Sequence, residues 1–78
     1  MYNYDQAVAR CTQEGMTIAT PQQVQVAWNQ GMSSCYCGWL ADRTIRFPIQ
    51  YPEAPCGGGT SSGLITCGQD LANVYCYK

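Results

Sequence analysis

Residues 35–56 have the sequence CYCGWLADRTIRFPIQYPEAPC, and this stretch says most about the fold of the 78-residue chain. A Gly-Trp-Leu-Ala-Asp run at 38–42 is followed by Phe-Pro-Ile at 47–49 and by Cys56-Gly57. Aromatic and β-branched residues in short runs are typical of strands. The pattern predicts strands at 36–41, 44–49, 63–67 and 74–77.

A helix is predicted over residues 4–14. Apolar residues recur there with the spacing of one helix face, at Tyr4, Ala7, Val8 and Cys11. Asn3 followed by Gln6 resembles a capping box, and Gly15 can supply the left-handed residue that ends a helix.

A second helix is predicted to begin at Thr20 and to end at Gly31. The Thr20 hydroxyl can cap the helix, Pro21 suits its first position and Gln23 completes a capping box. The core-facing residues are expected to be Val24, Ala27 and Trp28. Helices and strands together predict a compact α+β fold in a single domain over residues 1–78.

The chain contains six cysteines and no histidine. An even number of cysteines in so small a domain indicates disulfides formed in an oxidising compartment, so we expect a secreted or extracellular protein. The alternative is a metal site or a redox thiol at Cys35-x-Cys37, which the absence of histidine and of a Cys-x-x-Cys pair disfavours. The residues alone do not choose among about 15 possible pairings.

Charge excludes several classes of partner. Four basic residues face five acidic ones, with a net charge of −1. Binding to nucleic acid, heparin or an anionic membrane needs clustered cations, which are absent from the sequence. No apolar run approaches the length of a membrane span. The glycine-rich run at 57–63 has no predicted helix behind it, so we do not expect it to bind phosphate.

An enzyme is one hypothesis for the function. A glycosidase could use two carboxylates such as Asp42 and Asp70, but no motif supports this and the acids are scattered. We expect no catalytic residue, no metal and no cofactor.

The motifs of 35–57 together resemble the Link module, a small disulfide-linked domain with a C-type-lectin-like fold. The resemblance extends over nearly the whole chain. Tyr4, Ala7 and Cys11 are similar to the family's first helix, and 18–20 with 24–31 to its second. The closing strands are matched by 63–65 and 75–77. Link modules normally have a first strand before the position of Met1, so the chain looks truncated, processed or cut from something longer.

The resemblance also implies a disulfide pairing. In Link modules the first and last of four cysteines pair, as do the middle two, which carries over as Cys11–Cys76 and Cys35–Cys56. That leaves Cys37 and Cys67 to join each other. Cys67 occupies a position where hyaluronan-binding members usually have a tyrosine. A Cys37–Cys67 disulfide would therefore replace part of the sugar-binding surface with a covalent clamp.

The function implied by the resemblance is hyaluronan or glycosaminoglycan binding in the extracellular matrix or in cell adhesion. Sugar rings stack on aromatic side chains, and uronates pair with Arg or Lys. The candidate ligand-binding residues are Tyr36, Arg46, Phe47 and Tyr51. Phe47 matches the family's platform aromatic. The other large aromatics are expected in the core: Trp28, Trp39, Tyr75 and Tyr77.

A structural role is the alternative to sugar binding. Asp70 falls near the position of a uronate-pairing arginine in the family, and an aspartate there would repel hyaluronan. A sheet edge left open by a missing first strand could pair with a protein partner or another copy of the chain. The module would then act by protein contact or self-assembly.

Overall fold

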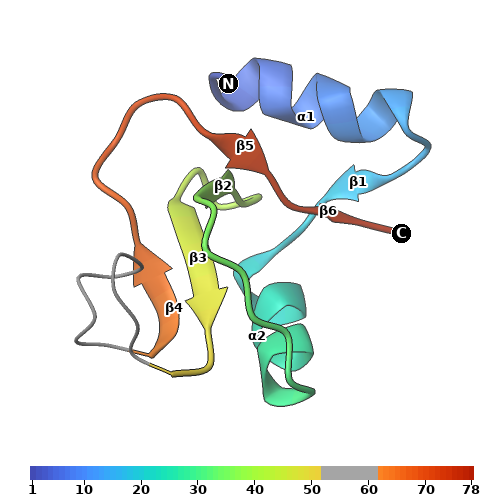
Figure 1. The fold of residues 1–78 in the computed structure, drawn as a ribbon. Helices are drawn as coiled ribbons and strands as arrows, with labels where there is room; N and C mark the ends of the chain where they lie inside the picture. Colours follow the sequence, from blue (N-terminus) through green and yellow to red (C-terminus); the bar gives the residue numbers. More distant parts are fainter. Residues whose placement is uncertain (52–61) are drawn as a thin grey trace.

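The structure is a computed structural model that describes residues 1–51 and 62–78. The first half contains α1 (Tyr4–Gln13), β1 (Thr17–Ile18), α2 (Pro21–Asn29), β2 (Gly38–Trp39) and β3 (Ile45–Ile49). The second half contains β4 (Gly63–Thr66), β5 (Asn73–Val74) and β6 (Cys76–Tyr77). Helix α1 lies against β1 and β5, whereas α2 lies against β3 and β4 (Figure 1). The predicted α+β class is confirmed.

The strands form two sheets. The larger sheet has the order β4-β3-β2-β5, in which only the β2–β5 pair is parallel. The smaller sheet pairs β1 with β6 in antiparallel fashion. An isolated antiparallel bridge joins Tyr2 to Ala72, just before β5. This arrangement brings the two ends of the chain beside α1 (Figure 1).

Helix α1 has the predicted caps. The Asn3 side chain accepts a hydrogen bond from the Gln6 N–H at 2.9 Å, and the Gln6 side chain accepts one from the Asn3 N–H at 2.9 Å. Gly15 has φ +73°, the left-handed conformation that ends a helix without a Cβ clash. Ala7 and Cys11 are fully buried, so the predicted stripe does face the core.

Helix α2 also begins at a capping box. The Thr20 hydroxyl accepts from the Gln23 N–H at 3.1 Å, and Pro21 is the first helical residue. Thr20 caps this helix, but the assignment of Ile18 and Ala19 to it was wrong, because Ile18 lies in β1 and the Ala19 N–H donates to the Tyr75 carbonyl. Pairing with the C-terminal strand holds this segment extended.

Two predicted strands differ from the observed ones. Strand β2 is shorter than the predicted 36–41, because the chain turns back after Leu40. Arg43, which lies in this turn, takes φ +66°. The predicted strand at 74–77 is divided between two sheets at Tyr75, whose N–H donates to Trp39 and whose carbonyl accepts from Ala19. Tyr75 is buried as expected, but the expectation that Tyr77 lies in the core was wrong, because its strand continues into the small sheet and its side chain is half exposed.

Two clusters of buried side chains form the core. One contains Ala19, Val24, Leu40 and Tyr75, with Met32 and Leu64 packed against it. The other contains Phe47 and Ile49, packed against Cys37, Ile65 and Cys67. The indole N–H groups of Trp28 and Trp39 donate to the carbonyls of Ile49 and Tyr2, both at 2.8 Å. These bonds let partly buried indoles satisfy their polar atoms.

Two disulfides lie within the described residues. Cys11–Cys76 joins the end of α1 to β6, and Cys37–Cys67 joins the residues beside β2 and β4. Both pairings were expected. Cys35 is disulfide-bonded as well, and its expected partner, Cys56, lies outside the described residues. Over residues 1–51 and 62–78, no helix is long and apolar enough to cross a membrane.

Candidate functional site

Tyr36 is the predicted site residue with a firmly held and accessible ring. It follows Cys35 just before β2, and its side chain is 45% exposed. One face of the ring stacks on Tyr75, with centroids 4.7 Å apart and planes inclined by 16°. The Tyr75 hydroxyl donates a hydrogen bond to the Tyr36 carbonyl at 2.6 Å. Tyr36 therefore offers an exposed aromatic surface on a rigid support.

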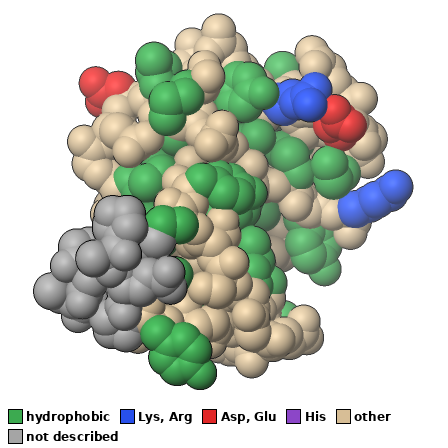
Figure 2. All heavy atoms as spheres, viewed as in Figure 1, with side chains coloured by type: hydrophobic (Ala, Val, Ile, Leu, Met, Phe, Trp, Pro, Cys, Tyr) green, Lys and Arg blue, Asp and Glu red, His purple; other side chains and the backbone are tan. Residues whose placement is uncertain are grey.

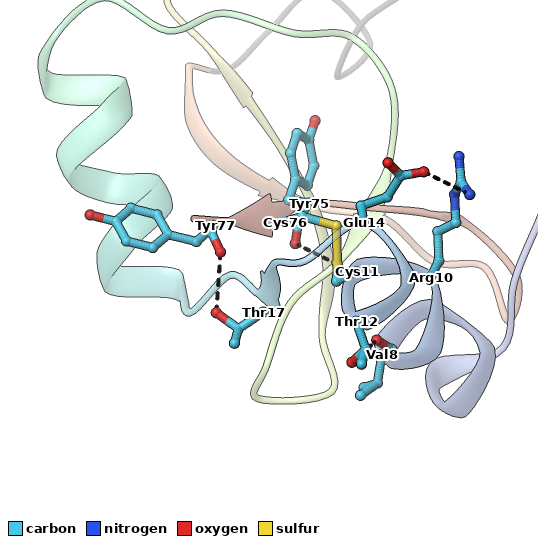
Figure 3. Close-up of a disulfide and its surroundings, with 9 residues drawn as sticks. All are labelled: Val8, Arg10, Cys11, Thr12, Glu14, Thr17, Tyr75, Cys76 and Tyr77. Carbon is cyan, nitrogen blue, oxygen red and sulfur yellow. Dashed lines mark hydrogen bonds and ion pairs between the residues drawn. A yellow bond between two sulfur atoms is a disulfide. The ribbon is translucent and has the colours of Figure 1, made fainter.

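An open groove of about 560 Å³ lies beside Tyr36. It is bounded by the C-terminal half of α1 and by β5, and its lining residues are Tyr2, Arg10, Glu14, Met16, Tyr36, Asn73, Val74 and Cys76. Arg10 and Glu14 form an ion pair at 2.9 Å and are both about half exposed. Figure 3 shows this pair extending from α1 near the Cys11–Cys76 disulfide.

Burial disfavours the charged form of both stacked tyrosines. It raises the pKa of Tyr75 to about 12, and the pKa of Tyr36 is raised for the same reason. A phenol that keeps its proton remains a hydrogen-bond donor and carries no negative charge. Both rings are neutral at physiological pH, as tyrosines ordinarily are, and present no charge that would repel an anionic sugar.

Phe47 lies in the second core cluster and is only 5% exposed. Its ring is packed against the Cys37–Cys67 disulfide and Ile65. The expected disulfide is thus formed directly over the aromatic residue that the resemblance implied as the sugar platform. Contact between Phe47 and a ligand stays a prediction, whereas the packing role of Phe47 is evident from its neighbours.

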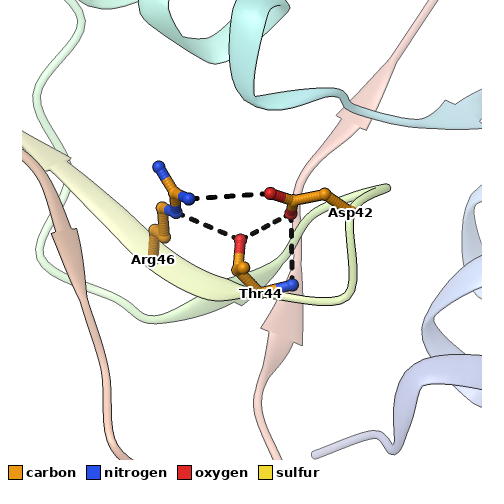
Figure 4. Close-up of polar contacts among 3 residues, drawn as sticks. All are labelled: Asp42, Thr44 and Arg46. Carbon is orange, nitrogen blue, oxygen red and sulfur yellow. Dashed lines mark hydrogen bonds and ion pairs between the residues drawn. The ribbon is translucent and has the colours of Figure 1, made fainter.

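Arg46 is held in a polar network at the turn between β2 and β3. Its Nε donates to the Thr44 hydroxyl at 3.1 Å, and its Nη2 lies 3.6 Å from Asp42 Oδ2 (Figure 4). The same carboxylate accepts from the Thr44 hydroxyl at 2.6 Å. The acid offsets the charge of this cation, which is partly exposed, and fixes the turn.

Tyr51 follows β3 and is 77% exposed. The four predicted ligand-binding residues do not all line the groove, because only Tyr36 among them contributes to it. In Figure 2 the charged side chains are few, and hydrophobic side chains are spread among polar groups and backbone over the face. The visible face of the described residues thus carries no basic patch.

Two residues important for Tyr36 were missed by the sequence reasoning. Tyr75 was expected in the core, which is correct, but its stacking and hydrogen bond to Tyr36 were not foreseen. Gly38 belongs to the Gly-Trp motif, and a Cβ there would lie 2.6 Å from Tyr75 Cε2. The glycine in this motif was the signal for a close approach.

A further missed contact braces the β2–β3 turn. The Arg43 guanidinium lies 4.3 Å from the centre of the Tyr4 ring, in cation–π geometry. Tyr4 also contacts Trp39 edge to face, with centroids 5.6 Å apart, and donates to the Ala41 carbonyl. Arg43 is therefore engaged with α1.

The disulfides, the helix order and the sheet arrangement define a small disulfide-linked α+β domain. A comparison with family models identifies its class: residues 1–77 match the extracellular link domain, so the chain belongs to the Link family. Membership confirms the expected family and extracellular setting.

Similar proteins include the versican core proteins of three mammals. The chain is 40% identical to that of Homo sapiens over 81 residues, which covers 96% of this chain and 2% of the relative. For the protein of Rattus norvegicus the identity is 38%, and the match covers 96% of this chain and 3% of the relative. For the protein of Bos taurus the identity is 37%, and the match covers 96% of this chain and 2% of the relative. The chain thus spans only a small part of these relatives.

Proposed function

We propose that this domain is a non-catalytic binding module of the extracellular matrix or cell surface and that its ligand is hyaluronan. The observation that carries the proposal is the match to the extracellular link domain over residues 1–77. Hyaluronan is the ligand implied by the motif resemblance of 35–57. The exposed, stacked ring of Tyr36 supplies the aromatic surface that a pyranose needs.

The sugar is bound mainly by stacking and by neutral hydrogen bonds. Arg46 and Arg10 are the cations available to a uronate, yet each is already paired, with Asp42 and Glu14. Exposed ion pairs are weak, so a uronate can compete for either guanidinium. Tyr51 provides a further exposed ring. Binding in this mode depends less on salt than binding by a basic cluster.

Calorimetric titration with a defined hyaluronan oligosaccharide tests the proposal. The Tyr36→Ala variant removes the exposed ring and is expected to weaken binding about tenfold or more, since about 1.4 kcal/mol of lost interaction corresponds to that factor. Tyr77→Ala is the matched control, because Tyr77 is also a half-exposed tyrosine and does not line the groove. Equal affinity of wild type and Tyr36→Ala would overturn the assignment of Tyr36.

The non-catalytic part of the proposal is tested on the same samples. Mass spectrometry of the oligosaccharide after long incubation with the domain is expected to show an unchanged chain length. Shortened products would contradict a pure binding role.

A second candidate function is self-assembly, which one feature of the sheet favours. β5 is at the end of the strand order β4-β3-β2-β5, and the Tyr2–Ala72 bridge lies next to it. The groove runs beside Asn73 and Val74 of this strand. Another chain could add a strand at such an edge. Sedimentation equilibrium tests this: mass that rises with concentration supports assembly, and a constant monomer mass contradicts it.

A further inference from the structure

We propose that Tyr75 and Gly38 are positioning residues that hold Tyr36 in place as a sugar-stacking platform. This inference rests on the proposed function. It assigns a ligand-related role to two residues that make no contact with the sugar themselves. Their effect on binding would be exerted through the orientation of the Tyr36 ring.

Two contacts from Tyr75 fix Tyr36. The ring of Tyr75 supports one face of the Tyr36 ring at a centroid distance of 4.7 Å. Its hydroxyl reaches the Tyr36 main chain and donates to the carbonyl at 2.6 Å. One contact restrains the side chain and the other restrains the backbone that carries it. Together they limit both the position and the rotation of the exposed ring.

Tyr75 is itself held by the core. It is 5% exposed and packs with Ala19, Val24 and Leu40 in the first core cluster. Its main chain is bonded to both sheets, through the Trp39 carbonyl at 3.3 Å and the Ala19 N–H at 2.9 Å. The next residue, Cys76, is tied to α1 by a disulfide. A restraint from Tyr75 is therefore a restraint from the core of the domain.

Gly38 makes room for this support. A Cβ at position 38 would lie 2.6 Å from Tyr75 Cε2 and 3.3 Å from its Cγ. Carbon atoms in proteins do not approach so closely, so any other residue at 38 would displace the Tyr75 ring. The displaced ring could no longer stack on Tyr36 in the same way. Gly38 is thus required by the tyrosine pair.

Holding the ring in advance favours binding. An exposed tyrosine that moves freely loses rotamer freedom when a ligand immobilises it, and that loss subtracts from affinity. A ring already stacked in the free protein avoids most of this loss. Both phenols keep their protons at physiological pH, and burial raises their pKa values further above it.

Tyr75→Phe is the sharpest test, because it keeps the stacked ring and removes only the hydroxyl that donates to Tyr36. With a hyaluronan oligosaccharide as the probe, we expect Tyr75→Phe to weaken binding by about three- to tenfold. Tyr77→Phe, two residues away and half exposed, is the matched control and should bind as wild type does. Combining Tyr75→Phe with Tyr36→Leu should abolish the effect of the former, since Tyr75 acts through Tyr36.

A measurement on the unliganded wild type does not depend on any variant folding. NMR relaxation of the tyrosine rings should show Tyr36 to be as rigid as the core, whereas Tyr51 and Tyr77 should be mobile. A Tyr36 ring as mobile as those two would overturn the positioning role.

The outcomes separate the two proposals. Wild type that binds hyaluronan while Tyr75→Phe binds equally well overturns the positioning role alone. Wild type that does not bind the oligosaccharide overturns the proposed function and, with it, this inference. The inference is supported if Tyr75→Phe binds more weakly while Tyr77→Phe keeps the wild-type affinity. Tyr75→Phe should also leave the affinity of the Tyr36→Leu variant unchanged.

Discussion

Cys37 and Cys67 are bonded to each other across β3. Cys37 directly precedes β2, Cys67 directly follows β4, and β3 lies between these two strands in the sheet. The Cα atoms are 6.3 Å apart, and the Cys67 N–H donates to the Ile45 carbonyl of β3 at 2.8 Å. The bridge packs against Phe47. It therefore ties together the two strands that flank β3, β2 and β4, and covers the aromatic ring between them.

Removal of this bridge should destabilise the domain and uncover Phe47. For a sequence separation of 30 residues, the chain-entropy estimate gives a loss of about 3–4 kcal/mol in the free energy of unfolding. Urea unfolding of the Cys37→Ala/Cys67→Ala double variant measures it. The comparison is Cys11→Ala/Cys76→Ala, which removes a bridge of sequence separation 65 and empties the fully buried position of Cys11, and should cost more. A larger loss at Cys37–Cys67 would contradict this order.

Gly38→Ala should destabilise the domain by about 1–3 kcal/mol, because the added methyl group would overlap the Tyr75 ring. Gly68→Ala is the control: nothing lies within 4 Å of a Cβ at that exposed position, and its effect should stay within about 0.5 kcal/mol. Thermal unfolding of both variants checks the difference. Equal melting temperatures would show that Tyr75 is not constrained by Gly38.

The two capping boxes should each stabilise their helix. Asn3→Ala and Thr20→Ala remove a side-chain acceptor from the first turn of α1 and α2, and each should cost about 1 kcal/mol in unfolding free energy. Thr12→Ala serves as the control, since Thr12 is an exposed residue within α1 whose hydroxyl bonds to the Val8 carbonyl. Chemical denaturation should leave this control within about 0.5 kcal/mol of wild type.

Stability should fall at high pH because of Tyr75. Its pKa is raised by burial from 10.0 to about 12, so the folded state holds the phenolic proton more tightly than the unfolded state does. The resulting stabilisation is fully present below pH 10 and is lost as the pH rises through the folded-state value. Urea unfolding at increasing alkaline pH measures the decline. Tyr75→Phe should decline less steeply, and an identical decline would contradict the assignment to Tyr75.

Local chemistry explains why much of the fold was predictable. Capping boxes join residues three positions apart, so the pairs Asn3–Gln6 and Thr20–Gln23 are visible in the sequence and are present in the structure. The stripe that contains Ala7 and Cys11 is likewise a local pattern. The resemblance added the pairing of the cysteines, which no local rule provides.

Features set by distant partners were not predictable in the same way. Strand β1 has two residues and exists through its pairing with β6, near the other end of the chain. The hydrogen bond between Tyr75 and Tyr36 joins residues 39 positions apart, and although Gly38 signals a close approach, nothing nearby indicates the partner. By contrast, the burial of Phe47 could be read locally. Ile45, Phe47 and Ile49 alternate along the chain, which is typical of a strand with one buried face.

The central claim is that this Link module binds hyaluronan through the ring that Tyr75 supports. The most direct measurement is an NMR titration of the wild-type domain with a hyaluronan oligosaccharide, following the assigned tyrosine ring signals. The account predicts saturable shifts of the Tyr36 ring, with little change at the equally exposed Tyr77. Shifts that avoid Tyr36, or none at saturating oligosaccharide, would contradict it.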